Sequence, residues 1–407
     1  MLSILRLFKQ QGWKVEFATP AQATEHMADL GSEGVSSQSI ELNSDSFDSY
    51  VMTYKPDIVL FDRFMMEEQF GWRVDKYCPR ALKILDTEDL QCLRHARHQA
   101  VKAEREMTLD DLYSDIAKRE IAAILRCDLS LVISSYEIQL LTETFKIDSS
   151  LLYHLPFMVD LEKCPTHTKG FSQRNHFISI GNFRHAPNWD MVLYLQKIWP
   201  KIRQKIPDAE LHIYGAYPPP KATALNNPAT GFLVKGWTED ALSVMESARV
   251  CLAPLRFGAG IKGKLLDAMI VQTPSVTTTI GSEGMYQYAA GTDEAGSNVI
   301  CPDERCPDEI WPGAVVDDIA GFVNAALEIY TDEKAWNRSS RAASRLLNKY
   351  YDARLSGAGL IDKIIETDSH IKQHRLNNFT GAMLKHHTMK STQYMSQWIA
   401  AKNSKVV

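Results

Sequence analysis

The stretch ARVCLAPLRFGAGIKGKLLDAM, residues 248–269, joins an apolar run, a glycine-rich turn and an amphipathic segment. The apolar run that ends at Pro254 is typical of a buried strand. Beyond Gly260, apolar residues recur at the spacing of one helical face, at Ile261, Leu265, Leu266, Met269 and Ile270. The pattern therefore predicts a strand, a tight turn and a helix in immediate succession.

The start of this predicted helix has the composition of an anion-binding site. A helix N-terminus offers unpaired backbone N–H groups and a partial positive charge, and Gly258 and Gly260 let a ligand approach the backbone. Lys262 and Lys264 add positive charge, and Asp267 lies three residues after Lys264, on the same helical face. We interpret the stretch as a phosphate-binding site with a carboxylate one turn further on. The alternative is an exposed Lys264–Asp267 pair beside an ordinary turn.

Composition limits the classes of protein to consider. The chain has 407 residues, of which 45% are hydrophobic and 23% charged, with a formal net charge of −5. This length suits two globular domains, and a negative net charge argues against nucleic acid as a partner. No apolar run approaches the length of a transmembrane segment. The seven scattered cysteines favour reduced thiols and therefore a cytoplasmic location.

Short apolar runs alternate with helical segments along most of the chain. Five runs in the first 156 residues predict strands: WKVEFATP (13–20), PDIVLFD (56–62), ALKILD (81–86), LSLVIS (129–134) and SLLYHLP (150–156). Segments between them predict helices, including a long one over 90–126, and a second set of strands begins near His176. Strands that are apolar throughout and alternate with helices predict parallel sheets covered on both faces, an α/β fold of two Rossmann-like domains.

We place the domain boundaries by these two sets. Residues 1–168 are predicted to form the first domain, 169–350 the second, and 351–407 a helical C-terminal extension that crosses back to the first domain. The first helix, over residues 2–11, is followed by a strand but has no strand before it. In a doubly wound sheet the first strand is central. We therefore expect the first domain to lack its first strand here, and the native protein to begin upstream of Met1.

Polar residues follow several predicted strands at the edge where ligands bind in open parallel sheets. Asp86 ends one strand of the first domain, and Arg184 and His185 follow the strand FISI (177–180) of the second. The alternative is that strand ends are polar because they become loops and helix caps, as Asp89 and Ser135 could. Together the polar residues are consistent with one cleft between the two domains. A further glycine loop, with Gly281 and Gly284, follows the next strand and could bring backbone amides to the same ligand.

Four stretches then resemble, in order and spacing, the nucleotide-sugar half of group 1 (family 4-like) glycosyltransferases. They are FISIGNFRHAPNWD (177–190), LHIYGA (211–216), VKGWTEDALSVMESARVCLAPLRFGAGIKGKLLDAM (234–269) and PSVTTTIGSEGM (274–285). The resemblance covers about residues 177–350. Through KPDIVLFDR (55–63) and LKILDTEDLQCLRHAR (82–97), the first half resembles the family's acceptor domain more loosely.

The resemblance implies the GT-B fold, with two Rossmann-like domains facing across a cleft, and a retaining, metal-independent enzyme without a cofactor. It implies that Asp267 binds the ribose hydroxyls of the donor, and that Lys264 and Lys262 lie at its diphosphate. It also implies that Arg184 contributes to the same phosphates and that Trp237 contacts the nucleotide base. With Gly258, Gly260 and Gly281, these residues form the predicted donor site.

The chain also departs from the family pattern. Many members carry two glutamates with seven residues between them, whereas here the second position is Asp267 and the first is Ala259. Many relatives have a histidine in the region where this chain has Asp86, and His95 is a weak substitute. We expect Asp86 to act with Lys264 in catalysis, from the acceptor side, by orienting a hydroxyl or by favouring positive charge on the sugar.

The predicted function is therefore that of a hexosyl or glycosyl transferase of carbohydrate biosynthesis, which moves a sugar from a nucleotide diphosphate sugar to an acceptor. The acceptor could be a glycan, a lipid or a protein. One alternative is a GT-B nucleotide-sugar epimerase, which would share the phosphate site but need acid and base groups facing the sugar. The other is a non-catalytic nucleotide-sugar-binding protein.

Overall fold

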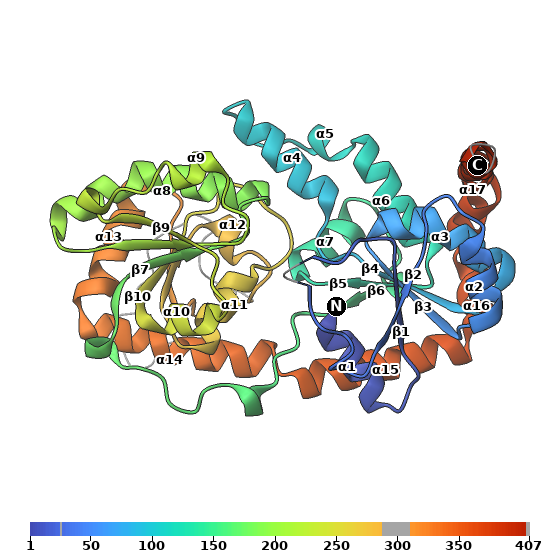
Figure 1. The fold of residues 1–407 in the computed structure, drawn as a ribbon, viewed down its shortest axis with the longest axis horizontal. Helices are drawn as coiled ribbons and strands as arrows, with labels where there is room; N and C mark the ends of the chain where they lie inside the picture. Colours follow the sequence, from blue (N-terminus) through green and yellow to red (C-terminus); the bar gives the residue numbers. More distant parts are fainter. Residues whose placement is uncertain (25–26, 287–309, 404–407) are drawn as a thin grey trace.

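Parallel sheets organise the chain in two halves: one sheet of six strands in the second half, and one of four and one of two strands in the first (Figure 1). The computed structural model describes residues 1–24, 27–286 and 310–403. Among these residues, no helix is both long and apolar enough to cross a membrane. The observed architecture is the predicted α/β fold of two Rossmann-like halves, followed by helices that return to the first half.

The second half is built on a six-stranded sheet with the order β12-β11-β10-β7-β8-β9, in which all neighbours pair in parallel. Its strands are β7 (Asn175–Ile180), β8 (Leu211–Tyr214), β9 (Phe232–Gly236), β10 (Ala248–Ala253), β11 (Ser275–Thr277) and β12 (Gly313–Val315). Its helices are α8 (Ala186–Lys205), α9 (Pro220–Thr223), α10 (Ala241–Ser247), α11 (Gly263–Ile270), α12 (Thr279–Ser282), α13 (Ile319–Thr331) and α14 (Glu333–Tyr350).

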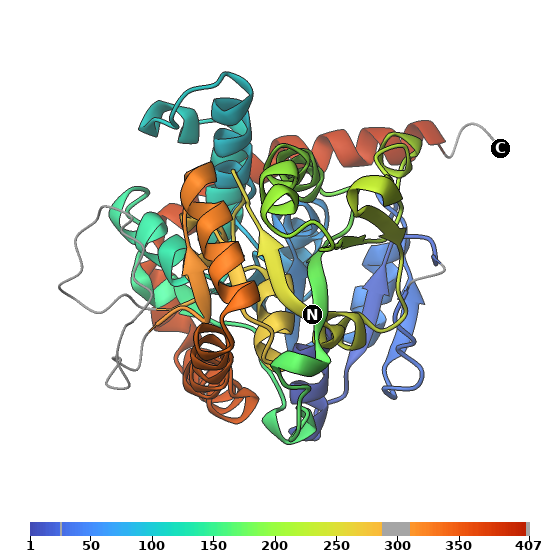
Figure 2. The same cartoon turned by 90° about the vertical axis from the view of Figure 1, so that its left-hand side faces the viewer.

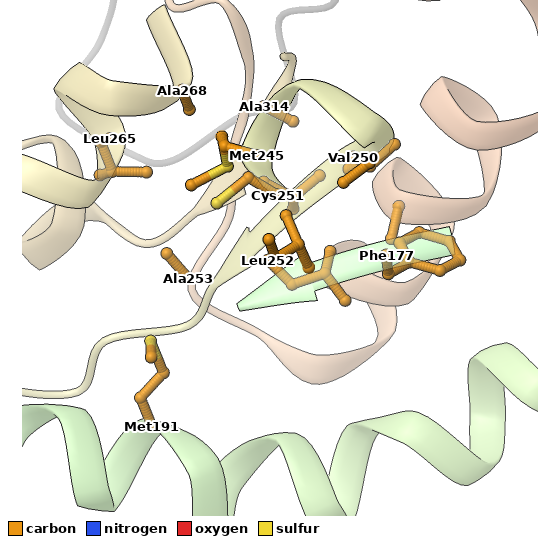
Figure 3. Close-up of a cluster of buried hydrophobic side chains, with 14 of the residues drawn as sticks. Phe177, Met191, Met245, Val250, Cys251, Leu252, Ala253, Leu265, Ala268 and Ala314 are labelled. Atoms are coloured by element: carbon orange, nitrogen blue, oxygen red, sulfur yellow. The ribbon is translucent and has the colours of Figure 1, made fainter. Parts of the chain in front are cut away.

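Strand β10 lies at the centre of this half. It pairs with β7 on one side and β11 on the other, and its side chains from Val250 to Ala253 are fully buried. Met191 of α8 approaches the strand from one direction, and Leu265 of α11 from another (Figure 3). Because both edges and both faces of β10 are occupied, its carboxyl end is held firmly where the glycine-rich turn begins.

The sheet of the first half is in two parts. Four parallel strands have the order β3-β4-β5-β6, and β1 pairs in parallel with β2 alone. The strands are β1 (Glu16–Thr19), β2 (Ser36–Ser39), β3 (Ile58–Asp62), β4 (Leu82–Asp86), β5 (Leu129–Val132) and β6 (Leu152–His154). Among the described residues, no strand precedes α1 (Leu2–Gln10), and no ladder joins β1 to β3.

The helices of this half differ in one place from the expectation. The segment over 90–126 is not continuous but consists of α4 (Gln91–Lys102), α5 (Leu109–Leu112) and α6 (Asp115–Arg126). Thr108 and Asp111 form a capping box at the start of α5, and the Ser114 hydroxyl caps α6. Such caps begin new helices. The remaining helices are α2 (Ser46–Tyr54), α3 (Phe64–Tyr77) and α7 (Ser135–Glu143). Strand β2 has a polar, exposed sequence and was not predicted.

The chain returns to the first half after α14, as expected. Helix α15 (Ala353–Ser369) contributes Leu360 and Ile364 to a core shared with Ile4 and Leu82. Helices α16 (Ile371–Asn377) and α17 (Phe379–Asn403) follow, and α17 contacts α3 and α6 at the outer side of the first half (Figures 1 and 2). Arg375 anchors this region, because its guanidinium donates 2.8 Å hydrogen bonds to both carboxylate oxygens of buried Asp128.

A buried ion pair in the first half offers a test of its packing. Glu67 of α3 and Arg126 of α6 are both buried, and the Arg126 Nε lies 3.0 Å from each carboxylate oxygen of Glu67. We expect Glu67→Ala to lower the free energy of unfolding by about 3–5 kcal/mol, because it leaves Arg126 buried without a partner. The matched control is Glu68→Ala, which removes the exposed pair with Arg119 and should cost about 1 kcal/mol or less. Urea unfolding curves measure both, and equal losses would contradict this expectation.

Candidate active site between the two halves

A cavity of about 400 Å³ lies between the halves, at the carboxyl ends of their strands. The second half lines it with the turn after β10, the first turns of α11 and the start of α8. The first half lines it with residues that follow β3 and β4. The lining residues are Arg63, Glu88, Asp89, Arg94, Ile133, Phe157, Ile180, Gly181, His185, Pro187, Asn188, Leu255, 258–264 and Asp267. Four of them are lysine or arginine, which suits an anionic ligand.

A larger hollow of about 660 Å³ lies beside the ends of β1 and β2. Of the described residues that line it, Glu41 is the single charged one. A site that offers no cation and one carboxylate does not suit a diphosphate. The cavity between the halves is therefore the better candidate for a nucleotide site.

Lys264 and Asp267 both face the cavity but do not pair with each other. The Lys264 ammonium donates a 2.6 Å hydrogen bond to the side-chain oxygen of Asn188 on α8, and no ion pair among the described residues joins it to Asp267. Burial lowers the pKa of Lys264 to about 8 and raises the pKa of Asp267 to about 6. The alternative of an exposed surface pair is therefore wrong.

Lys262 immediately precedes α11 and folds back over the turn. Its ammonium donates a 2.6 Å hydrogen bond to the Gly260 carbonyl, and burial lowers its pKa to about 8. The backbone N–H groups of Gly263 and Lys264, in the first turn of α11, make no hydrogen bond to another described residue. The helix start thus presents two ammonium groups and two free backbone donors beside the same cavity.

Gly260 lines the cavity and also lets the two halves touch, as does Gly284 in a later loop. Gly260 has φ +63°, and a Cβ there would lie 2.9 Å from the Cβ of Asp89 in the first half. Gly284 has φ +70° and faces Ser134 of the first half with equally little room. Side chains at these positions would push the halves apart.

Polar contacts join the halves at the same place. One carboxylate oxygen of Glu137, on α7, accepts hydrogen bonds from the backbone N–H groups of Leu90 (3.0 Å) and Gly260 (2.7 Å). Burial raises the pKa of Glu137 to about 7, and its second oxygen has no partner among the described residues. Arg97 of α4 donates two 2.7 Å hydrogen bonds to Glu283 and one of 2.9 Å to the Gly258 carbonyl.

Comparison with known proteins agrees with this geometry. Residues 174–332 match the sequence model of the family described as glycosyl transferases group 1. This part of the chain is similar to group 1 glycosyltransferases. The resemblance inferred from the sequence is therefore confirmed for this domain. A comparison with curated protein sequences found no match.

Among solved structures, similar folds are GT-B glycosyltransferases. HepE of Anabaena, in complex with UDP, is 10% identical, with a TM-score of 0.64, over 90% of this chain and 95% of its own. A glycosyltransferase from Rickettsia africae is 13% identical, with a TM-score of 0.58, over 89% of this chain and 92% of its own. TarM of S. aureus, in complex with fondaparinux, α-GlcNAc-glycerol and UDP, is 13% identical, with a TM-score of 0.55, over 79% of this chain. This chain spans 58% of the length of TarM.

Not all predicted site residues of the glycosyltransferase domain line the cavity. Gly258, Gly260, Lys262, Lys264 and Asp267 do. Three others do not: the guanidinium of Arg184 lies 3.7 Å from the ring centre of Tyr217, Trp237 is exposed, and Gly281 packs in α12 against Thr277.

Asp86, predicted to be catalytic, is not among the residues that line the cavity. It is buried at the end of β4, and burial together with the nearby Glu88 carboxylate raises its pKa to about 6. It accepts a 3.2 Å hydrogen bond from the backbone N–H of Glu88, and Glu88 and Asp89, which follow it in the chain, do line the cavity.

The sequence analysis did not single out Arg94, Arg97 and Glu137. Arg94 lines the cavity and pairs with Asp89, and the other two join the halves. Arg94 and Arg97 are three residues apart on α4, so they share a face. Nothing in that spacing indicates that the face meets another domain.

Gly260→Ala tests the contact between the halves. We expect this variant to increase the radius of gyration measured by small-angle X-ray scattering, because the new Cβ would overlap Asp89. Gly12→Ala is the matched control: Gly12 also has a positive φ, of +75°, but nothing lies within 4 Å of its added Cβ. It should cost about 1–2 kcal/mol in backbone strain without changing the scattering. Identical scattering of the two variants would contradict the proposed role of Gly260.

Proposed function

We propose that this protein transfers a glycosyl group from a nucleoside diphosphate sugar to an acceptor. The observation that carries the proposal is the start of α11, where Lys262, Lys264 and two unpaired backbone N–H groups meet Asp267 in a cavity between two Rossmann-like halves. The match of residues 174–332 to group 1 glycosyltransferases supports it. UDP is the first nucleotide to test, since the solved structures of HepE and TarM hold UDP.

The departing diphosphate gains negative charge as the bond to the sugar breaks. Lys262, Lys264 and the free N–H groups at the start of α11 would stabilise that charge in a site from which water is partly excluded. Their positions are set before the ligand arrives, because Lys264 is held by Asn188 and Lys262 by the Gly260 carbonyl. With pKa values of about 8, both ammonium groups are mainly charged at neutral pH.

Asp267 would accept hydrogen bonds from the ribose hydroxyls. It lies one turn further along α11 than Lys264 and lines the same cavity, so a nucleoside diphosphate could reach both. Burial raises the pKa of Asp267 to about 6, so it is mainly ionised at pH 7 and can accept from two hydroxyls.

The first half would supply the acceptor side. Arg63, Glu88, Asp89 and Arg94 face the start of α11 across the cavity. We propose that the transfer proceeds with retention of the anomeric configuration, as the similarity of residues 174–332 to group 1 glycosyltransferases implies. We also propose that it needs no metal ion, because Lys262 and Lys264 are in place to take the charge of the diphosphate. The anomeric configuration of the product, determined by NMR, and activity in the presence of EDTA test these two points.

The function itself is tested by incubating the protein with UDP-sugars and measuring three things: bound nucleotide, released UDP and altered sugar. Release of UDP that increases with added glycan or lipid acceptor supports glycosyl transfer. An altered UDP-sugar without release of UDP would assign the protein as an epimerase. Binding without any turnover over a panel of acceptors would assign it as a binding protein.

Lys264 and Asp267 should contribute to binding in distinguishable ways. We expect Lys264→Ala to weaken UDP binding by roughly 10- to 150-fold, since a hydrogen bond to a charged group is worth about 1.5–3 kcal/mol. Asp267→Asn should weaken UDP binding but not the binding of inorganic pyrophosphate, which has no ribose. Isothermal calorimetry measures all of these affinities. The control is Lys118→Ala, on the exposed surface of α6. If both site variants bound UDP and pyrophosphate with the parental affinities, the assignment of the phosphate site would be wrong.

Asp86 should influence turnover more than donor binding, because it lies in the first half and does not line the cavity in which we propose that the donor binds. We expect Asp86→Asn, which keeps the shape but removes the charge, to lower kcat for sugar transfer while the Kd for UDP stays within about twofold. Measuring both on one preparation separates the roles. Unchanged transfer would leave Asp86 as a structural residue at the end of β4, and so would a loss of folding.

A further inference from the structure

The last helix, α17, exposes a row of large apolar side chains. Phe379, Met383, Tyr394 and Trp398 have 76%, 47%, 63% and 60% of their surface exposed. Their spacings of 4, 11 and 4 residues place them on one side of a helix with 3.6 residues per turn. We call these four residues the α17 stripe, and it runs for roughly 30 Å at 1.5 Å per residue.

The opposite side of α17 is packed, so the exposure of the stripe is not the result of a detached helix. Helix α17 contacts α6 and α3. Gly381 fits against the carbonyl of Leu125, and the hydroxyl of buried Ser396 accepts a 3.3 Å hydrogen bond from Arg73. The helix is therefore seated on the first half with its apolar stripe turned outward, which is unusual for a surface without a partner.

The C-terminal segment that contains α17 is also rich in positive charge. The 39 residues that follow Asp368 contain six lysine and arginine residues and no aspartate or glutamate, although the whole chain has a net charge of −5. Arg375 and Lys385 pair with Asp128 and Asp75 of the first half. Lys402 lies beside the stripe, with its ammonium 5.3 Å from the ring centre of Trp398. Because no aspartate or glutamate follows Asp368, the segment that carries the stripe has a positive net charge.

We propose that the α17 stripe docks the protein on the surface of a lipid bilayer that carries anionic headgroups. Aromatic and methionine side chains enter the boundary between headgroups and acyl chains, while lysines reach the headgroup phosphates. A second copy of the chain is a poorer occupant, because two stripes would bring like charges together without an acidic counterpart.

The proposal does not depend on glycosyl transfer, and its test needs no sugar donor. The purified chain is mixed with vesicles of phosphatidylcholine alone, or of phosphatidylcholine with phosphatidylglycerol, and the bound fraction is separated by flotation. We expect binding to the vesicles with phosphatidylglycerol, weaker binding to neutral vesicles, and a decrease with added salt. Absence of binding to the anionic vesicles would overturn the proposal.

Substitutions locate the binding face. We expect Tyr394→Ala combined with Trp398→Ala to lower the partition coefficient by about tenfold or more, since each lost aromatic removes at least about 1.4 kcal/mol of apolar burial. Leu355→Ala is the matched control, because Leu355 is 69% exposed on α15 but lies outside the stripe. Circular dichroism checks that both variants fold. Parental binding by the double variant would overturn the proposal. So would a dimer in sedimentation velocity that the double variant abolishes, since the stripe would then belong to a second copy.

Discussion

The contact between Glu137 and the backbone N–H of Gly260 is the constraint on which the candidate site depends. It joins a helix of the first half to the turn that starts α11, and the same carboxylate oxygen also holds the N–H of Leu90. No side chain larger than hydrogen fits at Gly260 without displacing Asp89. The position of the first half against this turn therefore sets the shape of the cavity and the distance between its two walls.

Burial at this contact also determines the electrostatics of the site. Lys262 and Lys264 are partly removed from water, which lowers their pKa values, and Asp267 is partly removed from water, which raises its pKa. The site keeps these charged groups because neutral oxygens of the turn and of Asn188 hold the two ammonium groups. Because these partners are neutral, the positive charges of Lys262 and Lys264 would attract an anion in the cavity strongly.

The two halves are connected twice, and the two connections lie side by side. Val159, in the first connection, exchanges backbone hydrogen bonds of 2.8 Å with Tyr351 and 2.9 Å with Ala353, in the second. Beyond this point α15 enters the core of the first half and α17 covers its outer side. The C-terminal helices are thus part of the first half's structure, and the α17 stripe is carried on that half.

The sequence by itself determined the local elements and the chemistry of α11. Apolar periodicity identified β10, the glycine turn and the helix, and the side chains of Lys262, Lys264 and Asp267 predicted an anion site, because these features depend on neighbours within a few residues. It missed polar β2, and it missed the breaks in α4–α6, where caps at Thr108 and Ser114 interrupt the apolar pattern. Only the tertiary structure decided that Gly260 serves the contact between the halves, that Arg94 and Glu137 reach that region, and that Arg184 and Trp237 are not among the residues that line the cavity. These outcomes depend on how the two halves meet, and residues more than 100 positions apart leave no periodic signal in the chain.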